Sequence, residues 1–216
     1  MSHGWPRYDL YVITDPVIGR GRPHAEIARA ALEGGADAVQ LRDKSSNAHN
    51  LCRAALEIQP LARRYGAVFL VNDRVDVAMV TGADGAHVGQ EDLPAREARR
   101  LLPRPRVLGV SAGTVEEARR AQKEGADYIG VGPVFSTGTK PDAGQPIGLE
   151  ALAAIVSAVT IPVVAIGGID ADNVAGIFRS GASGAAVVTT VVSAEDMAAA
   201  ARALKRRIAE VRRAAS

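Results

Sequence analysis

The stretch TVEEARRAQKEGADYIGVG, residues 114–132, contains the unit from which most of this chain is built. Its first part is rich in Ala, Arg and Glu and has the apolar spacing of a helix. A Gly-Ala pair follows at 125–126, and glycine just after the last helical turn is a common stop signal. The last part, DYIGVG, is a short apolar run of the kind found in buried strands. The stretch therefore predicts a helix that stops at a glycine and leads into a strand.

The same unit recurs along the chain. Apolar runs that predict buried strands lie at 8–14, 37–42, 67–72, 85–89, 106–111, 127–132, 162–168 and 184–190. Helical stretches separate them, and several of these end in Gly-Ala directly before the next run. Strands that are apolar on both faces and alternate with helices indicate a parallel sheet covered by helices.

Eight such units in 216 residues favour a (β/α)8 TIM barrel, a fold that typically takes about 250 residues. An open doubly wound sheet is less consistent, because the segment after the first run, residues 12–23, lacks the glycine spacing of a dinucleotide-binding turn. We expect a single domain over residues 1–216, with its active site where the strands end and the following loops begin.

The composition is that of an ordinary globular protein, with 47% hydrophobic and 23% charged residues. The net charge of +2 gives no reason to expect binding to nucleic acid or to a membrane. No run approaches the ~20 apolar residues of a membrane span, and the first ten residues lack the pattern of a signal peptide. Cys52 is the only cysteine, which excludes an internal disulfide and a cysteine-based zinc cluster. We expect a cytoplasmic protein, and a homo-oligomer is compatible with the sequence.

Polar side chains gather at the end of the second predicted strand. Because side chains alternate along a strand, Gln40, Arg42 and Lys44 should share one face. A strand that is buried on both sides should not direct an arginine inward unless an anion meets it. The alternation therefore predicts an anion-binding site at the mouth of the barrel, although Lys44 taken alone could equally belong to a solvated loop.

Carboxylates follow the next two predicted strands. Asn72 and Asp73 end the third, and Asp92 lies shortly after the fourth. Asp92 could instead cap the helix that Pro94 begins. Two aspartates beside a cationic cluster nevertheless suit a Mg²⁺ and phosphate site, because Mg²⁺ takes oxygen ligands and completes its shell with water and phosphates. We interpret His87 as a histidine of the core or rim rather than a metal ligand.

The ends of the four later strands complete the predicted mouth. The fifth strand ends at Ser111, and the sixth leads into the irregular loop 132–144, which contains STGTK at 136–140. Hydroxyls, glycines and one lysine are the ingredients of a phosphate cradle. The loops after the seventh and eighth strands form a phosphate site in many barrels of this kind, and here the seventh strand ends in Gly167-Gly168.

Taken together, these motifs resemble the thiamine-phosphate synthase family. The segments QLRDK, ND, ADGAHVGQEDLP, GVSAGT, DYIGVGPVFSTGTK and AIGGI occur in the order and near the spacings of that family, over nearly the whole chain. The resemblance implies a (β/α)8 barrel transferase that uses Mg²⁺. It joins a hydroxymethylpyrimidine diphosphate to a thiazole phosphate, and it releases pyrophosphate and thiamine monophosphate.

The resemblance also implies roles for individual residues. The pyrimidine diphosphate would be bound by Gln40, Arg42, Lys44, Asn72, Ser111 and Lys140. The thiazole phosphate would be bound by Thr137, Gly138, Thr139, Gly168, Val188 and Thr189. Mg²⁺ would be held by Asp73 and Asp92. One departure is visible, because Thr189-Thr190 replaces the serine and small residue that the family usually has after its eighth strand.

Other functions stay open at this stage. A thiazole tautomerase of the same fold would need a general acid or base instead of a diphosphate site, and a Schiff-base aldolase would need a desolvated lysine on a strand. A regulatory barrel could bind phosphate ligands without catalysis, because a fold does not fix a function. For the loop 132–144 we expect an ordered state with ligand bound and a mobile one without it.

Overall fold

The computed structural model describes residues 8–138 and 144–214 of the chain. Eight parallel strands pair in sequence order and close into a barrel, because β1 pairs with β2 on one side and with β8 on the other. The strands are β1 Leu10–Thr14, β2 Ala38–Leu41, β3 Val68–Asn72, β4 Gly85–Val88, β5 Val107–Ala112, β6 Tyr128–Val131, β7 Val163–Ile166 and β8 Gly184–Val187. The predicted (β/α)8 barrel is confirmed, and each strand falls on one of the eight apolar runs, with β5 extending one residue further, to Ala112.

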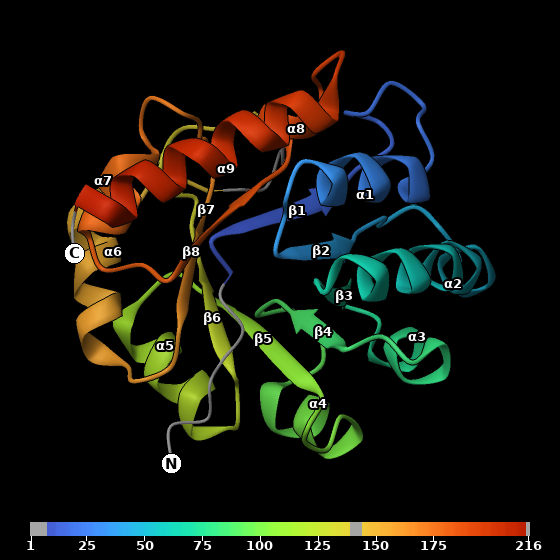
Figure 1. Ribbon diagram of the computed structural model, residues 1–216. Helices are drawn as coiled ribbons and strands as arrows, with labels where there is room; N and C mark the ends of the chain where they lie inside the picture. Colours follow the sequence, from blue (N-terminus) through green and yellow to red (C-terminus); the bar gives the residue numbers. More distant parts are fainter. Residues whose placement is uncertain (1–7, 139–143, 215–216) are drawn as a thin grey trace.

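Helices surround the barrel (Figure 1). They are α1 His24–Glu33, α2 Ala48–Tyr65, α3 Val75–Thr81, α4 Ala95–Leu101, α5 Val115–Lys123, α6 Gly148–Ala158, α7 Val174–Arg179, α8 Thr189–Val192 and α9 Met197–Ala214. In the described residues no helix is both long enough and apolar enough to cross a membrane.

Glycine ends two of the helices as the sequence predicts. Gly66 and Gly82 follow α2 and α3 in the left-handed conformation, at φ 65° and 68°. Their N–H groups donate back to carbonyls of the last helical turn. Only glycine adopts this conformation without a steric cost, so the chain can leave the helix and turn directly into the next strand.

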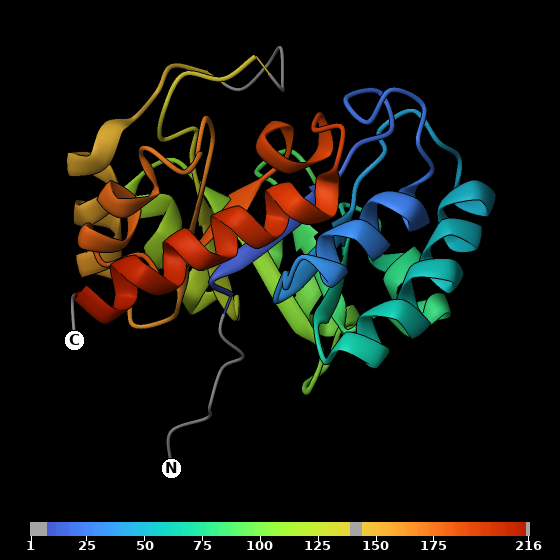
Figure 2. The ribbon, with the colours of Figure 1, turned by 45° about the horizontal axis from the view of Figure 1, so that its top comes forward.

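Aspartates fix the base of the barrel, where the strands begin. Asp37, Asp84 and Asp127 precede β2, β4 and β6, and each side chain accepts the N–H at the start of the strand before it. The acceptor distances are 2.8 Å in all three cases. The loops that follow the strands rise at the opposite end, as the connections after β1 and β6 show in Figure 2.

The eighth unit departs from the prediction. The apolar run was expected to stay extended through Thr190, but β8 ends at Val187 and Thr189 begins the short helix α8. Val188 makes the turn, with φ −118° and ψ −80°. The apolar, β-branched residues beyond Val187 suit a strand, but Val191 and Val192 are buried on α8 instead. Tertiary packing thus overrides local propensity here.

Candidate active site

Two adjoining cavities open at the end of the barrel where the strands finish. The larger, about 300 Å³, lies over β5 to β8, and the smaller, about 100 Å³, lies mainly over β1 to β4 and is also lined by residues of β5 to β8. Both cavities are lined by Ser111, Gly130, Ile166 and Ala186, which therefore form a partition between them. The two cavities therefore adjoin each other at this partition.

The smaller cavity collects the cationic residues that the sequence singled out. Gln40, Arg42 and Lys44 all line it, as their alternation along β2 predicts. Gln40 is 2% exposed, and its Nε2 donates to the Tyr11 hydroxyl at 2.7 Å. The Lys44 side chain is 57% exposed, so it lies at the entrance of the smaller cavity and not at its floor.

Arg42 has an anionic partner that sequence reasoning missed. Its Nη1 lies 3.6 Å from Asp15 Oδ2, in the loop after β1. Asp15 also accepts the N–H groups of Val17 and Ile18, so the same side chain shapes its own loop and holds Arg42. The Arg42 Nε atom is buried and makes no hydrogen bond within residues 8–138 and 144–214. Arg42 therefore keeps donor capacity for an anionic ligand.

The two predicted metal ligands, Asp73 and Asp92, line the same cavity. Burial, together with a hydrogen bond to Asp92 and its negative charge, raises the pKa of Asp73 to about 6. Lys44 Nζ, 3.8 Å from Asp73 Oδ2, only partly offsets this repulsion. A pair of carboxylates held together in this way suits a cation with oxygen ligands. No group of three or more His, Cys, Asp or Glu that could hold a metal occurs in the described residues, so water and ligand oxygens would have to complete the shell.

Asp92 does not cap the helix that follows. The residue before α4 is Pro94, and no side chain caps this helix. Asp92 Oδ2 instead accepts the Gly89 N–H at 2.7 Å, which turns its carboxylate back toward the end of β4. The alternative interpretation of Asp92 as a helix cap is wrong, because the tight turn from Gly89 to Asp92 directs the side chain into the cavity wall.

His87 lies at the floor of the smaller cavity and contacts neighbours through both ring nitrogens. Nδ1 is 2.8 Å from the Tyr128 hydroxyl, and Nε2 is 2.9 Å from Ser111 Oγ. The interpretation of His87 as a histidine of the core or rim is confirmed. Sequence reasoning missed Tyr11 and Tyr128, which line the same cavity. The sequence places both tyrosines in predicted strands, but it does not indicate whether their side chains face the inside of the barrel or the surrounding helices.

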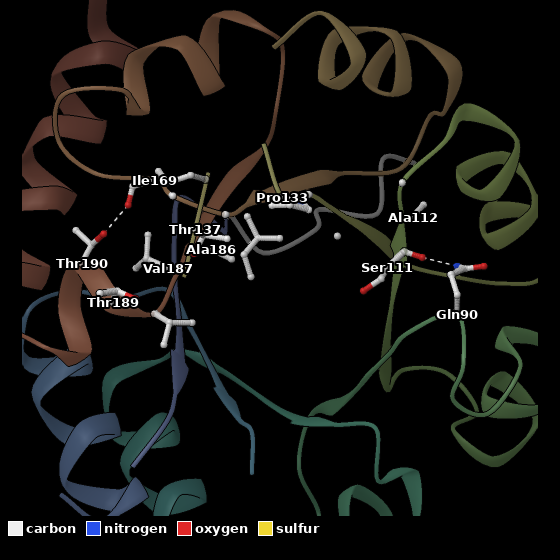
Figure 3. A pocket seen from close by; sticks show the side chains of 17 residues that line it. Gln90, Ser111, Ala112, Pro133, Thr137, Ile169, Ala186, Val187, Thr189 and Thr190 are labelled. Atoms are coloured by element: carbon white, nitrogen blue, oxygen red, sulfur yellow. Dashed lines mark hydrogen bonds between the residues drawn. The ribbon is translucent and has the colours of Figure 1, made fainter. Parts of the chain in front are cut away.

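The larger cavity is walled by glycine backbone and threonine side chains (Figure 3). Gly168, Val188 and Thr189 line it, as does Thr137 from the β6–α6 connection. Thr190 Oγ1 donates to the Ile169 carbonyl at 2.5 Å and joins the loops after β7 and β8. Gly167 and Gly168 have positive φ values of 104° and 62°, which bring the main chain close to the β6–α6 connection.

The β6–α6 connection is only partly within the described residues. Gly138 is exposed and does not line either cavity. Thr139 and Lys140 lie outside the described residues, as does the rest of 139–143 in the loop 132–144 for which we expect ordering upon ligand binding.

Fold and site together define a (β/α)8 barrel with two cavities at the ends of its strands, one lined by Arg42, Lys44, Asp73 and Asp92 and the other lined largely by loop residues after β6 to β8. Comparison with known proteins narrows this class. The family model described as thiamine monophosphate synthase matches residues 10–191, and the chain belongs to this family.

Close relatives agree with this membership. The thiamine-phosphate synthase of Moorella thermoacetica is 53% identical over 207 residues, covering 96% of this chain and 99% of that protein. The one from Methanoregula boonei is 54% identical over 202 residues, covering 94% of each chain. The solved thiamine phosphate pyrophosphorylase of Pyrococcus furiosus superposes with a TM-score of 0.88 at 43% identity, covering 95% of this chain and 98% of that one.

Proposed function

We propose that this chain is a thiamine-phosphate synthase. It transfers the pyrimidinylmethyl group of a hydroxymethylpyrimidine diphosphate to the nitrogen of a thiazole phosphate, and pyrophosphate leaves. The observation that carries the proposal is the pair of adjoining cavities with the common partition of Ser111, Gly130, Ile166 and Ala186. A reaction that joins two phosphate-bearing molecules needs two anion sites whose ligands meet at one place.

In this proposal the smaller cavity takes the pyrimidine diphosphate. Arg42 and Lys44 supply positive charge, Asn72 lines the wall, and Ser111 stands at the partition. Gln40 donates to Tyr11 through Nε2, so its carbonyl oxygen is the group suited to accept from an amino substituent on the pyrimidine. Lys140 would join this set from the β6–α6 connection, and it lies outside the described residues.

Asp73 and Asp92 fit a Mg²⁺ ion. Their paired carboxylates are hard oxygen donors, and the pKa of Asp73 is raised by burial and by the nearby Asp92, both of which a bound cation would offset. When bound there, Mg²⁺ would neutralise charge on the diphosphate and so favour its departure. Within the chain itself, Lys44 stands 3.8 Å from Asp73 and supplies positive charge to the same place.

The larger cavity takes the thiazole phosphate. Main-chain groups at Gly168, Val188 and Thr189 and the hydroxyl of Thr137 are the groups that would receive the phosphate. Backbone N–H groups can approach an anion closely where glycine leaves no side chain in the way. Thr139 would contribute from outside the described residues, and Gly138, which is exposed, would have to move inward to take part.

The arrangement supports a dissociative course. Departure of pyrophosphate leaves positive charge on the pyrimidinylmethyl carbon, which the electron-rich aminopyrimidine ring can delocalise. Fixed cations and hydrogen-bond donors stabilise the leaving group. Binding the thiazole across the partition then presents its nitrogen to that carbon, which is a contribution of positioning. No general base is required by this course.

The alternatives are less consistent with the site. A tautomerase needs no diphosphate site, but Gln40, Arg42, Lys44, Asp73 and Asp92 all line the smaller cavity. A Schiff-base aldolase needs a desolvated lysine, but Lys44 is 57% exposed.

Pyrophosphate release in the presence of both substrates tests the proposal. We expect release only when pyrimidine diphosphate, thiazole phosphate and Mg²⁺ are all present, and EDTA should abolish it. Binding of both substrates without any release would instead favour a regulatory phosphate-binding barrel. The cytoplasmic location and a homo-oligomeric state stay predictions from the sequence.

A further inference from the structure

Five polar side chains form one continuous chain of hydrogen bonds across the inside of the barrel. In order, they are Gln40, Tyr11, Tyr128, His87 and Ser111. The four successive distances are 2.7, 3.1, 2.8 and 2.9 Å. The chain connects β2, β1, β6, β4 and β5, and it ends at the partition between the two cavities.

The first three members of the chain are buried, His87 and Ser111 are half-buried, and the rings of Tyr128 and His87 are held in place by the backbone. Tyr11, Tyr128 and Gln40 are at most 2% exposed. A Cβ atom on Gly109 would lie 2.1 Å from the Tyr128 ring, and one on Gly130 would lie 2.8 Å from His87 Cε1. Glycine on two neighbouring strands therefore makes the room that these two rings occupy. The backbone thereby fixes the position of both rings.

The first member sets the direction of every proton in the chain. The amide Nε2 of Gln40 can only donate, so the Tyr11 oxygen accepts from it and turns its own proton toward Tyr128. Tyr128 then donates to His87 Nδ1. A neutral imidazole that accepts at Nδ1 carries its proton at Nε2, so His87 donates to Ser111 Oγ.

The opposite direction leaves a buried proton without a partner. If Tyr128 donated to Tyr11, the Tyr11 oxygen would accept twice and its own proton would have no acceptor. Leaving a buried donor unpaired is costly. Ionisation does not offer another arrangement, because burial raises the pKa of both Tyr11 and Tyr128 above the usual value.

We propose that His87 and Tyr128 are positioning residues that hold Ser111 as a hydrogen-bond acceptor from His87, so that the Ser111 proton is presented to the cavities. The inference rests on the proposed function for its catalytic consequence. Ser111 Oγ lies in the partition, where the leaving diphosphate oxygen would gain charge. A donor aimed at that oxygen beforehand stabilises the transition state more than the ground state.

The tautomer of His87 can be measured directly. The protein would be labelled with ¹⁵N in its four histidine side chains, and the His87 signals assigned by their loss in His87→Gln. In the native protein without substrates we expect Nε2 to be protonated and Nδ1 to be unprotonated. Protonation at Nδ1 instead would overturn the proposal, whether or not the enzyme makes thiamine phosphate.

Two phenylalanine variants separate the hydroxyl from the ring. Tyr128→Phe removes the donor to His87 Nδ1, so we expect His87 to lose its single tautomer and kcat to fall about tenfold, the size of one lost hydrogen bond. The KM for thiazole phosphate should not change. An unaltered His87 spectrum and unaltered kcat in Tyr128→Phe would contradict the proposal.

Tyr8→Phe is the matched control. Tyr8 belongs to the same aromatic group, with its ring centroid 5.4 Å from that of Tyr128, and it is equally buried. Its hydroxyl has no hydrogen-bond partner within the described residues. We expect the His87 spectrum and kcat of Tyr8→Phe to match the native protein. If native protein shows the Nε2–H tautomer but no turnover, the proposed function fails while the hydrogen-bond chain stands.

Discussion

At the scale of single residues, Asp73 and Asp92 form a pair of neighbouring carboxylates in the site. Both line the smaller cavity, and burial, together with the hydrogen bond to Asp92 and its negative charge, raises the pKa of Asp73. A carboxylate pair in a buried wall is costly unless a cation joins it. Removing one member therefore stabilises the empty site but removes an oxygen ligand for Mg²⁺.

We expect Asp92→Asn to lower kcat by about a hundredfold or more, in the range seen when an electrostatic contact to the transition state is lost. Steady-state assays over a Mg²⁺ titration would show the loss and a weaker apparent affinity for the ion. Asp76→Asn is the control, since Asp76 is an exposed aspartate of α3 that pairs with Arg74. Equal activity of Asp92→Asn and the native protein would remove Asp92 from the metal site.

Asp43 shows a second kind of residue-scale effect, because it organises the loop that carries Arg42 and Lys44. Its carboxylate accepts from the main-chain N–H and the hydroxyl of both Ser45 and Ser46, and His24 lies 3.4 Å away. Burial alone would raise the pKa of Asp43, but these hydrogen bonds outweigh it and hold the pKa well below its usual range. The ionised form therefore stabilises the folded protein.

The sign of the pH effect follows from this lowered pKa. The contribution of Asp43 is complete above its unfolded pKa of about 3.9 and is lost as the pH falls below it toward the folded pKa. Denaturant unfolding of native protein and Asp43→Asn should show a constant stability difference above about pH 5 that narrows in more acidic solution. A difference that widens on acidification would contradict this account.

At the scale of elements, the turn between β7 and α7 shapes the proposed phosphate pocket. Asn173 Nδ2 donates to the Gly168 carbonyl at 2.7 Å, and its Oδ1 accepts the Asp170 N–H at 3.0 Å. Asp170 in turn accepts the N–H groups of Asp172 and Asn173. The side chains of one short turn thereby fix the main chain of Gly168, whose φ of 62° places it in the left-handed region.

We expect Asn173→Ala to raise the KM for thiazole phosphate by about fivefold to tenfold, since it removes a hydrogen bond worth about 1 kcal/mol from the pocket's support. The KM for pyrimidine diphosphate should stay the same, because that ligand binds across the partition. Asp172→Ala, in the same turn, is the control, as its side chain makes no hydrogen bond in the described residues. A rise in both KM values would indicate general loosening of the barrel.

At the scale of the whole molecule, the barrel separates stability from chemistry. The proposed chemistry lies at the ends of the strands, whereas Asp127 lies at the base and is 2% exposed. Asp127 accepts from the Leu108 N–H at 2.8 Å, from Arg104 Nη2 at 3.0 Å and from Arg99 Nη2. This cluster joins β5, β6 and the end of α4 without contributing a side chain to either cavity.

We expect Asp127→Ala to cost about 3–5 kcal/mol of stability, because it leaves the Arg99 charge and the Leu108 N–H without their acceptor. The midpoint temperature of thermal unfolding should fall by about 10 °C for a protein of this size. At temperatures below the unfolding transition, kcat should stay close to the native value. Glu97→Ala breaks an exposed ion pair with Arg100 and should cost less than about 1 kcal/mol. If kcat of Asp127→Ala fell as far as we expect for Asp92→Asn, the base of the barrel would not be separate from the chemistry at the ends of the strands.

The sequence determined the fold to a large extent, because helix and strand periods and glycine stops depend on residues near one another in the chain. It also indicated which strand ends carry Gln40, Arg42, Lys44 and Asp73, since alternation along a strand decides which side chains share a face. The extent of β8 could not be predicted locally, because apolar β-branched residues suit both the strand and the buried face of α8.

Only the tertiary structure decided how these side chains are partnered. Tyr11 and Tyr128 are 117 positions apart, and Arg42 meets Asp15 from a different loop. Asp92 turned toward Gly89, although its place before Pro94 suited a helix cap equally well. The physical reason is that closing the barrel fixes the register of all eight strands at once. Short-range hydrogen bonds between distant residues form only after that register exists.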